Sequence, residues 1–66
     1  MSQFPEIDNM IDSINRSNVS NNLKNVMKRN IRLYIESKIE LIQQSILSQQ
    51  VKQPIIDELQ QKLKLI

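Results

Sequence analysis

The chain contains no cysteine, histidine, glycine, alanine, threonine or tryptophan, and only one phenylalanine and one tyrosine. Without cysteine and histidine it has no disulfide, no thiol or imidazole for catalysis, and none of the ligands of zinc fingers or iron–sulfur centres. Without glycine it has neither of the common loops that cradle phosphate groups. We therefore expect a protein that is not an enzyme, with no catalytic residue, no metal or other cofactor and no small-molecule substrate.

Long hydrophobic runs are also missing. The longest uncharged stretch, residues 41–51, is short and rich in glutamine and serine, so we expect no membrane-spanning helix. The first residues lack the basic stretch and apolar run of a signal peptide. We expect an intracellular protein, located in the cytoplasm or in the nucleoid or nucleus.

The 66 residues include 26 apolar ones and carry a net charge of +2. A chain of this length forms a single domain and buries only about 60% of the surface that its unfolded form exposes. Chains of this size are commonly stabilised by disulfides, by a metal or by a partner. Because the composition excludes the first two, we expect a partner, which is either a second copy or another protein.

Apolar residues at helical spacing predict an all-α fold. Pro5 precedes an apolar stripe that predicts a helix over about residues 5–15. Ser20 is the expected N-cap of a long central helix over about residues 20–52, and Pro54 is expected to open a third helix over about residues 54–66. With no glycine, we expect asparagine in the first turn wherever a positive φ is required. Two short helices would then flank the central one, and we expect them to assemble as an oligomeric bundle.

One alternative to the central helix is a strand over residues 31–35, where apolar and polar residues partly alternate. No residues beside this segment would turn a hairpin, so we favour the helix.

The predicted central helix has apolar residues on two opposite sides, although a surface helix of a monomer normally keeps its outer side polar. We therefore predict a non-enzymatic module for protein–protein interaction or oligomerisation that acts as an adaptor or regulator. Its predicted interaction face comprises Val26, Met27, Ile31, Leu33, Tyr34, Ile35, Ile42, Ile46, Leu47 and Val51. Two alternatives are that Val26, Leu33, Leu47 and Val51 are singly exposed aliphatic residues, or that a monomer buries every aliphatic side chain in one core.

Charge is distributed unevenly along the chain. Residues 1–12 carry a net charge of −3, residues 13–35 carry +5 without any acid, and residues 36–66 sum to zero. Lysine and arginine neutralise phosphates, so an alternative function is a small DNA- or RNA-binding protein, acting as a dimer. Its candidate contacts are Lys24, Lys28, Arg29 and Arg32. The other interpretation of these residues is a solvated basic face, or one that meets an acidic partner protein.

Overall fold

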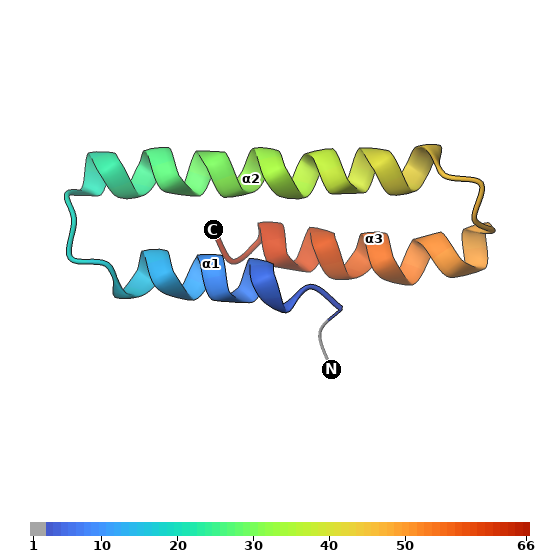
Figure 1. The fold of residues 1–66 in the computed structure, drawn as a ribbon, viewed down its shortest axis with the longest axis horizontal. Helices are drawn as coiled ribbons and strands as arrows, with labels where there is room; N and C mark the ends of the chain where they lie inside the picture. Colours follow the sequence, from blue (N-terminus) through green and yellow to red (C-terminus); the bar gives the residue numbers. More distant parts are fainter. Residues whose placement is uncertain (1–2) are drawn as a thin grey trace.

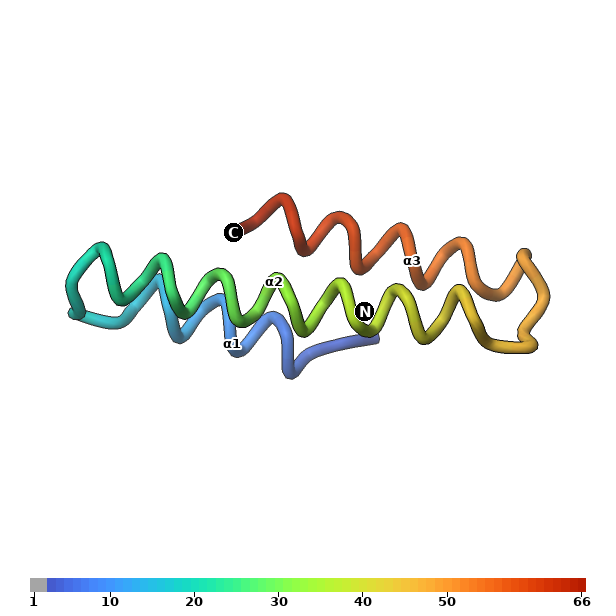
Figure 2. Tube along the Cα trace, turned by 90° about the horizontal axis from the view of Figure 1, so that it is seen from above, coloured from blue at the N-terminus to red at the C-terminus, as the bar shows by residue number. Residues whose placement is uncertain are grey.

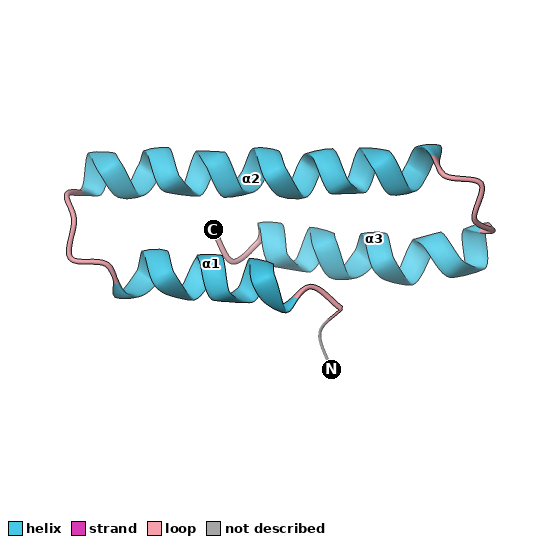
Figure 3. Cartoon of the chain, in the orientation of Figure 1, coloured by secondary structure: helices cyan, strands magenta, loops and turns pink. Residues whose placement is uncertain are grey.

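The computed structural model describes residues 3–66, and that part of the chain consists of three helices without a strand (Figures 1 and 3). Helix α1 spans Pro5–Arg16, α2 spans Asn21–Gln44, and α3 spans Gln49–Leu63. The predicted all-α class is confirmed, and the central helix is the longest of the three. The alternative strand over residues 31–35 is wrong, because these residues lie inside α2.

Helices α1 and α3 both run antiparallel to α2 and lie on the same side of it (Figure 1). Helix α1 follows the first half of α2 and α3 follows the second half, and seen from above they flank α2 on either side (Figure 2). The resulting body measures 42 × 22 × 15 Å, with a radius of gyration of 13.2 Å. Compact proteins of this length have a radius of gyration of about 11 Å, so the molecule is elongated and α2 is covered along one side.

Two predicted helix starts are confirmed. Pro5 occupies the first turn of α1, where its missing N–H needs no partner. The Ser20 hydroxyl accepts a hydrogen bond from the Leu23 N–H at 3.3 Å and caps α2. No residue from 3 to 66 has a positive φ, so the turn after α1 does not require the asparagine that we expected for such a position. Instead, Ser17 takes an extended conformation and ends α1 by donating both its N–H and its hydroxyl to the Ile14 carbonyl.

The same device ends α2 at Gln44, and therefore the predicted central helix to residue 52 is wrong. The Ser45 N–H and hydroxyl both donate to the Ile42 carbonyl, at 3.1 and 2.6 Å. Three residues later Ser48 precedes α3, and its carbonyl accepts from the N–H groups of Val51 and Lys52. Serine side chains compete with the helix for backbone groups, and here the Ser45 side chain stops α2, whereas Ser48 starts α3 through its backbone carbonyl alone.

The prediction that Pro54 opens the third helix is wrong. Pro54 lies inside α3, as its sixth residue. At this place the proline lacks the N–H that would bond to the Gln50 carbonyl one turn earlier. Gln50 is exposed, so water can reach that carbonyl. The helix also ends earlier than predicted, at Leu63, and the last residues form a turn in which the Leu65 N–H donates to the Lys62 carbonyl.

The core lies where the three helices meet near the middle of α2. Helix α1 contributes one stripe of isoleucines, α2 contributes Ile31 and Ile35, and α3 contributes Leu59. Together the buried cluster comprises Ile7, Ile11, Ile14, Ile31, Ile35 and Leu59. Ile7, Ile35 and Leu59 have no exposed surface, so one fully buried residue from each helix fixes the position of that helix.

Candidate protein interaction surface

The side of α2 that faces away from α1 and α3 carries four large aliphatic residues. We define the outer face as these four, Leu23, Val26, Leu33 and Leu41, together with the polar Asn30 and Ser37. The exposed fractions of Leu23, Val26, Leu33 and Leu41 are 47%, 46%, 56% and 67%. Helical spacing places Val26 and Leu33 opposite Ile31 and Ile35, which point into the core, and places Leu23 and Leu41 between these two sides of the helix. Soluble monomers seldom gather apolar residues along one uncovered helix face, so this surface is suited to contact another molecule.

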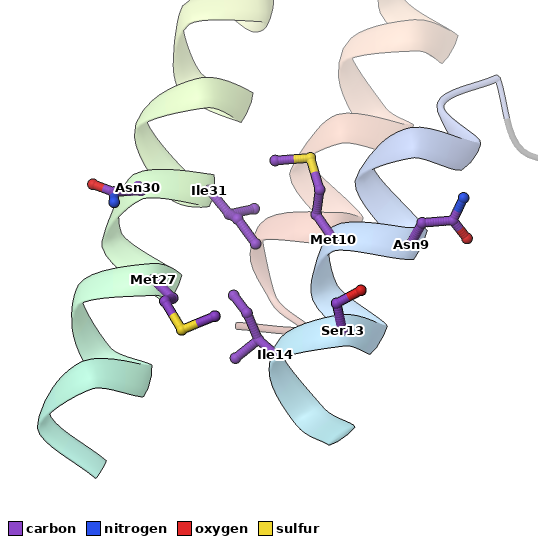
Figure 4. A pocket seen from close by; sticks show the side chains of 7 residues that line it. All are labelled: Asn9, Met10, Ser13, Ile14, Met27, Asn30 and Ile31. Atoms are coloured by element: carbon purple, nitrogen blue, oxygen red, sulfur yellow. The ribbon is translucent and has the colours of Figure 1, made fainter. Parts of the chain in front are cut away.

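A groove of about 390 Å³ between α1 and α2 adjoins the outer face. Its floor is apolar, with Ile14 and Met27 turned toward each other and Met10 and Ile31 beside them (Figure 4). Asn9, Ser13 and Asn30 line its rim, and Asn30 also belongs to the outer face. Methionine side chains adapt to differently shaped partners, so the groove extends the apolar surface available for contact.

The structure divides the ten residues of the predicted interaction face among different places. Ile31 and Ile35 are buried in the chain's own core, so their assignment to a partner contact is wrong in this fold. Met27 and Ile42 are half-buried against that core, and Tyr34, Val26 and Leu33 are exposed.

The remaining three predicted face residues lie outside α2. Ile46 and Leu47 are exposed in the loop that follows α2, and Val51 is exposed on α3. The prediction that Leu47 and Val51 share one side of the central helix with Val26 and Leu33, and that Ile46 lies on the other side with Met27, is therefore wrong. The cause is Ser45, which ends the helix before it reaches them.

Lys38 ties the start of the chain's first helix to α2. Its ammonium group lies 4.9 Å from the centre of the Tyr34 ring and 5.8 Å from the centre of the Phe4 ring. Phe4 immediately precedes α1, so this cation–π cluster joins the entrance of α1 to the middle of α2. Tyr34 thus takes part in a contact within the chain, although part of its side chain remains exposed.

The candidate nucleic-acid contacts spread over part of the first half of α2. Lys24 and Lys28 are half-buried, whereas Arg29 and Arg32 are exposed. The Arg32 guanidinium donates to the Ile66 carbonyl at 3.4 Å. In the described part of the chain none of the four forms an ion pair with an acid.

Lys62 is a buried charge that sequence reasoning missed, with an exposed fraction of 6%. Its ammonium lies 2.5 Å from an Asp8 carboxylate oxygen on α1 and 3.8 Å from a Glu58 oxygen on α3. The sequence signal is its position three residues after Leu59, which places it at the margin of the apolar stripe of α3. The pair joins α1 to α3 directly.

Two of the carboxylates interact only within their own helices. Asp12 forms an ion pair with Arg16 at 3.1 Å, and Glu40 accepts a hydrogen bond from the Gln44 amide. Over residues 3–66 no three carboxylates come together where they would hold a metal ion. Among the same residues, none of the helices combines the length and the apolar character needed to cross a membrane.

Comparison with protein-family models, with curated proteins and with solved structures finds no match to this chain.

Proposed function

We propose that the chain is a non-enzymatic helical module that binds a protein through the outer face of α2 and acts as an adaptor or regulator inside the cell. One observation carries the proposal: Leu23, Val26, Leu33 and Leu41 form an uncovered apolar row along the longest helix. The hydrophobic effect favours their removal from water, and no part of residues 3–66 covers them.

The surface area of the chain supports this proposal. It exposes 4874 Å², which is about 500 Å² more than is usual for a compact protein of its 7.8 kDa mass. The excess reflects the elongated shape, in which α2 is packed along one side only. Specific interfaces of ordinary size bury roughly 800 Å² per partner, so a partner would contact the adjoining groove as well as the outer face.

A photo-crosslinking experiment in cells that express the protein tests the proposal. A photoreactive amino acid placed at Leu33 should crosslink to a protein, because Leu33 is exposed at the middle of the outer face. The matched control places it at Gln61, which is exposed on α3 and is remote from that face. Equal labelling at the two positions, or no protein adduct at Leu33, would contradict the proposal.

Nucleic-acid binding is a second candidate function. The observation that favours it is that Lys24, Lys28, Arg29 and Arg32 have no acidic partner in the described structure. Binding of a mixed DNA and RNA pool should then strengthen as salt is lowered, since phosphate contacts release counterions. Replacing Lys28 and Arg29 with glutamine should reduce the slope of that salt dependence by about two. Absence of binding at low salt would exclude this function.

A further inference from the structure

Charge along α2 changes sign at the middle of the helix. The first half carries Lys24, Lys28, Arg29 and Arg32. The second half carries the acids Glu36 and Glu40, and also Lys38, whose ammonium lies over the Tyr34 and Phe4 rings. The midpoint of Asn21–Gln44 falls between Arg32 and Leu33, and Leu33 lies on the outer face. The helix therefore presents a basic end and an acidic segment on either side of an exposed leucine.

Arg29 and Glu36 are the charges that border the outer face most symmetrically. They are seven residues apart, which is about two helical turns, so both lie along the same edge. Both are exposed, and within residues 3–66 neither forms an ion pair. The two charges are opposite in sign and lie at equal distances from the helix midpoint. A second copy of the helix that runs in the reverse direction would therefore place a glutamate against each arginine.

We propose that a second copy of this chain packs antiparallel against the outer face of α2, with the two-fold axis beside Leu33. This inference rests on the proposed function and specifies its partner. Reversal about this point places Arg29 of each copy opposite Glu36 of the other, which gives two equivalent ion pairs. A parallel copy would instead place the edges that carry Arg29 and Glu36 on opposite sides of the interface, so neither ion pair would form.

The uncharged residues of the outer face fit the same reversal. Val26 of one copy lies near Leu41 of the other, and Leu33 meets its own counterpart at the axis. Asn30 and Ser37 are likewise brought together, so an amide and a hydroxyl meet where the apolar row is interrupted. Each copy offers a single helix face, and small interfaces are typically weak, so we expect the dimer to form at micromolar rather than nanomolar concentration.

Sedimentation analysis of the purified full chain from about 1 to 500 µM, the range in which such an interface assembles, tests the pairing. The unmodified chain should change from monomer to dimer across this range. Arg29→Glu and Glu36→Arg should each weaken the dimer about tenfold, because each replaces two ion pairs with like charges. An equimolar mixture of the two variants should form a heterodimer tighter than either homodimer. Lys64→Glu makes the same change of charge as Arg29→Glu at an exposed site just beyond the end of α3, and should have no effect.

Because the chain has no cysteine, single-cysteine variants report the direction of pairing. Under mild oxidation Leu33→Cys should form a disulfide with itself, since its two copies meet at the axis. Val26→Cys should not link to itself but should link to Leu41→Cys in a mixture. Self-linking of Val26→Cys would show a parallel dimer and overturn the proposal.

A chain that stays monomeric throughout the range also overturns the inference. If Leu33 nevertheless crosslinks to a different protein in cells, the proposed function stands and only the identity of the partner is wrong. If neither the purified chain nor the cellular crosslink shows a contact, both proposals fail. Circular dichroism of each variant confirms that its helices are intact, so a loss of dimer is assigned to the interface.

Discussion

The ion pair between Lys62 and Asp8 gives the sharpest test of how α1 and α3 are held together. The Lys62 ammonium is removed from water and lies 2.5 Å from Asp8 and 3.8 Å from Glu58. Replacing Asp8 with asparagine keeps the shape of the side chain but removes the charge that faces this ammonium. We expect Asp8→Asn to destabilise the fold because the lysine remains buried with weaker compensation.

The magnitude follows from the exposure of the partners. Breaking a fully buried ion pair costs about 3–5 kcal/mol. The Asp8 side chain is 43% exposed and Glu58 stays in place, so solvent screening reduces the expected loss to about 1–2 kcal/mol. For a chain of 66 residues one kcal/mol shifts the melting temperature by about 7 °C, which gives a fall of about 7–14 °C.

A double-mutant cycle isolates the pair. Lys62→Met keeps an apolar stem of similar size and removes the charge, so we expect its stability to be within about 1 kcal/mol of the unmodified chain. Asp8→Asn introduced into the Lys62→Met background should have almost no further effect, because no ammonium remains to be compensated. The assay is thermal unfolding followed by circular dichroism, at one fixed protein concentration because self-association shifts the midpoint.

Asp12→Asn is the matched control, since Asp12 lies one turn further along α1 and its pair with Arg16 is exposed. This variant should change stability by less than about 0.5 kcal/mol. Two results would refute the stabilising role of the Lys62–Asp8 ion pair. One is that Asp8→Asn changes stability as little as Asp12→Asn does, and the other is that Asp8→Asn destabilises the chain just as much when Lys62 is methionine.

Three further predictions concern the helices. Leu59→Ala should lower the free energy of unfolding by about 2–5 kcal/mol in urea titration, because Leu59 is fully buried; Gln60→Ala is its exposed control, and equal effects would contradict the assigned core. Pro54→Ala should raise the melting temperature, since it restores an N–H in the interior of α3 and relieves up to about 3 kcal/mol; a lower melting temperature would show that the proline is required. Ser20→Ala should cost about 0.5–2 kcal/mol through loss of the α2 cap, and Ser20→Asp should restore it; failure of the aspartate to restore stability would argue against capping as the cause.

Much of the fold could be predicted from the sequence because it depends on local chemistry. The spacing of Ile7, Ile11 and Ile14 places three apolar side chains on one side of α1, and all three are buried. The Ser20 cap and Pro5 at the first turn of α1 follow from the chemistry of helix ends, without reference to any other element. These features require only the residues within one or two turns.

The end of α2 also depends on local chemistry, but its signal is easily overlooked. Residues 17–20 and 45–48 both read serine, two other residues, serine, and both form the connection between two helices. The polar Asn18 is typical of a loop, whereas Ile46 and Leu47 extend the apolar pattern of α2 through the connection to α3. Serine chemistry outweighed the apolar pattern in that connection because Ser45 binds the Ile42 carbonyl.

The sequence by itself determined that the chain is helical, that one side of each helix is apolar, and that α2 carries a second apolar row. It did not determine which of these sides the chain covers, because that depends on where α1 and α3 lie along α2. The tertiary structure decided that Ile31 and Ile35 are core while Val26 and Leu33 are exposed, since both short helices pack on the same side. It also decided the burial of Lys62, because Asp8, the carboxylate on the neighbouring helix, is 54 residues away in the sequence and close only in space.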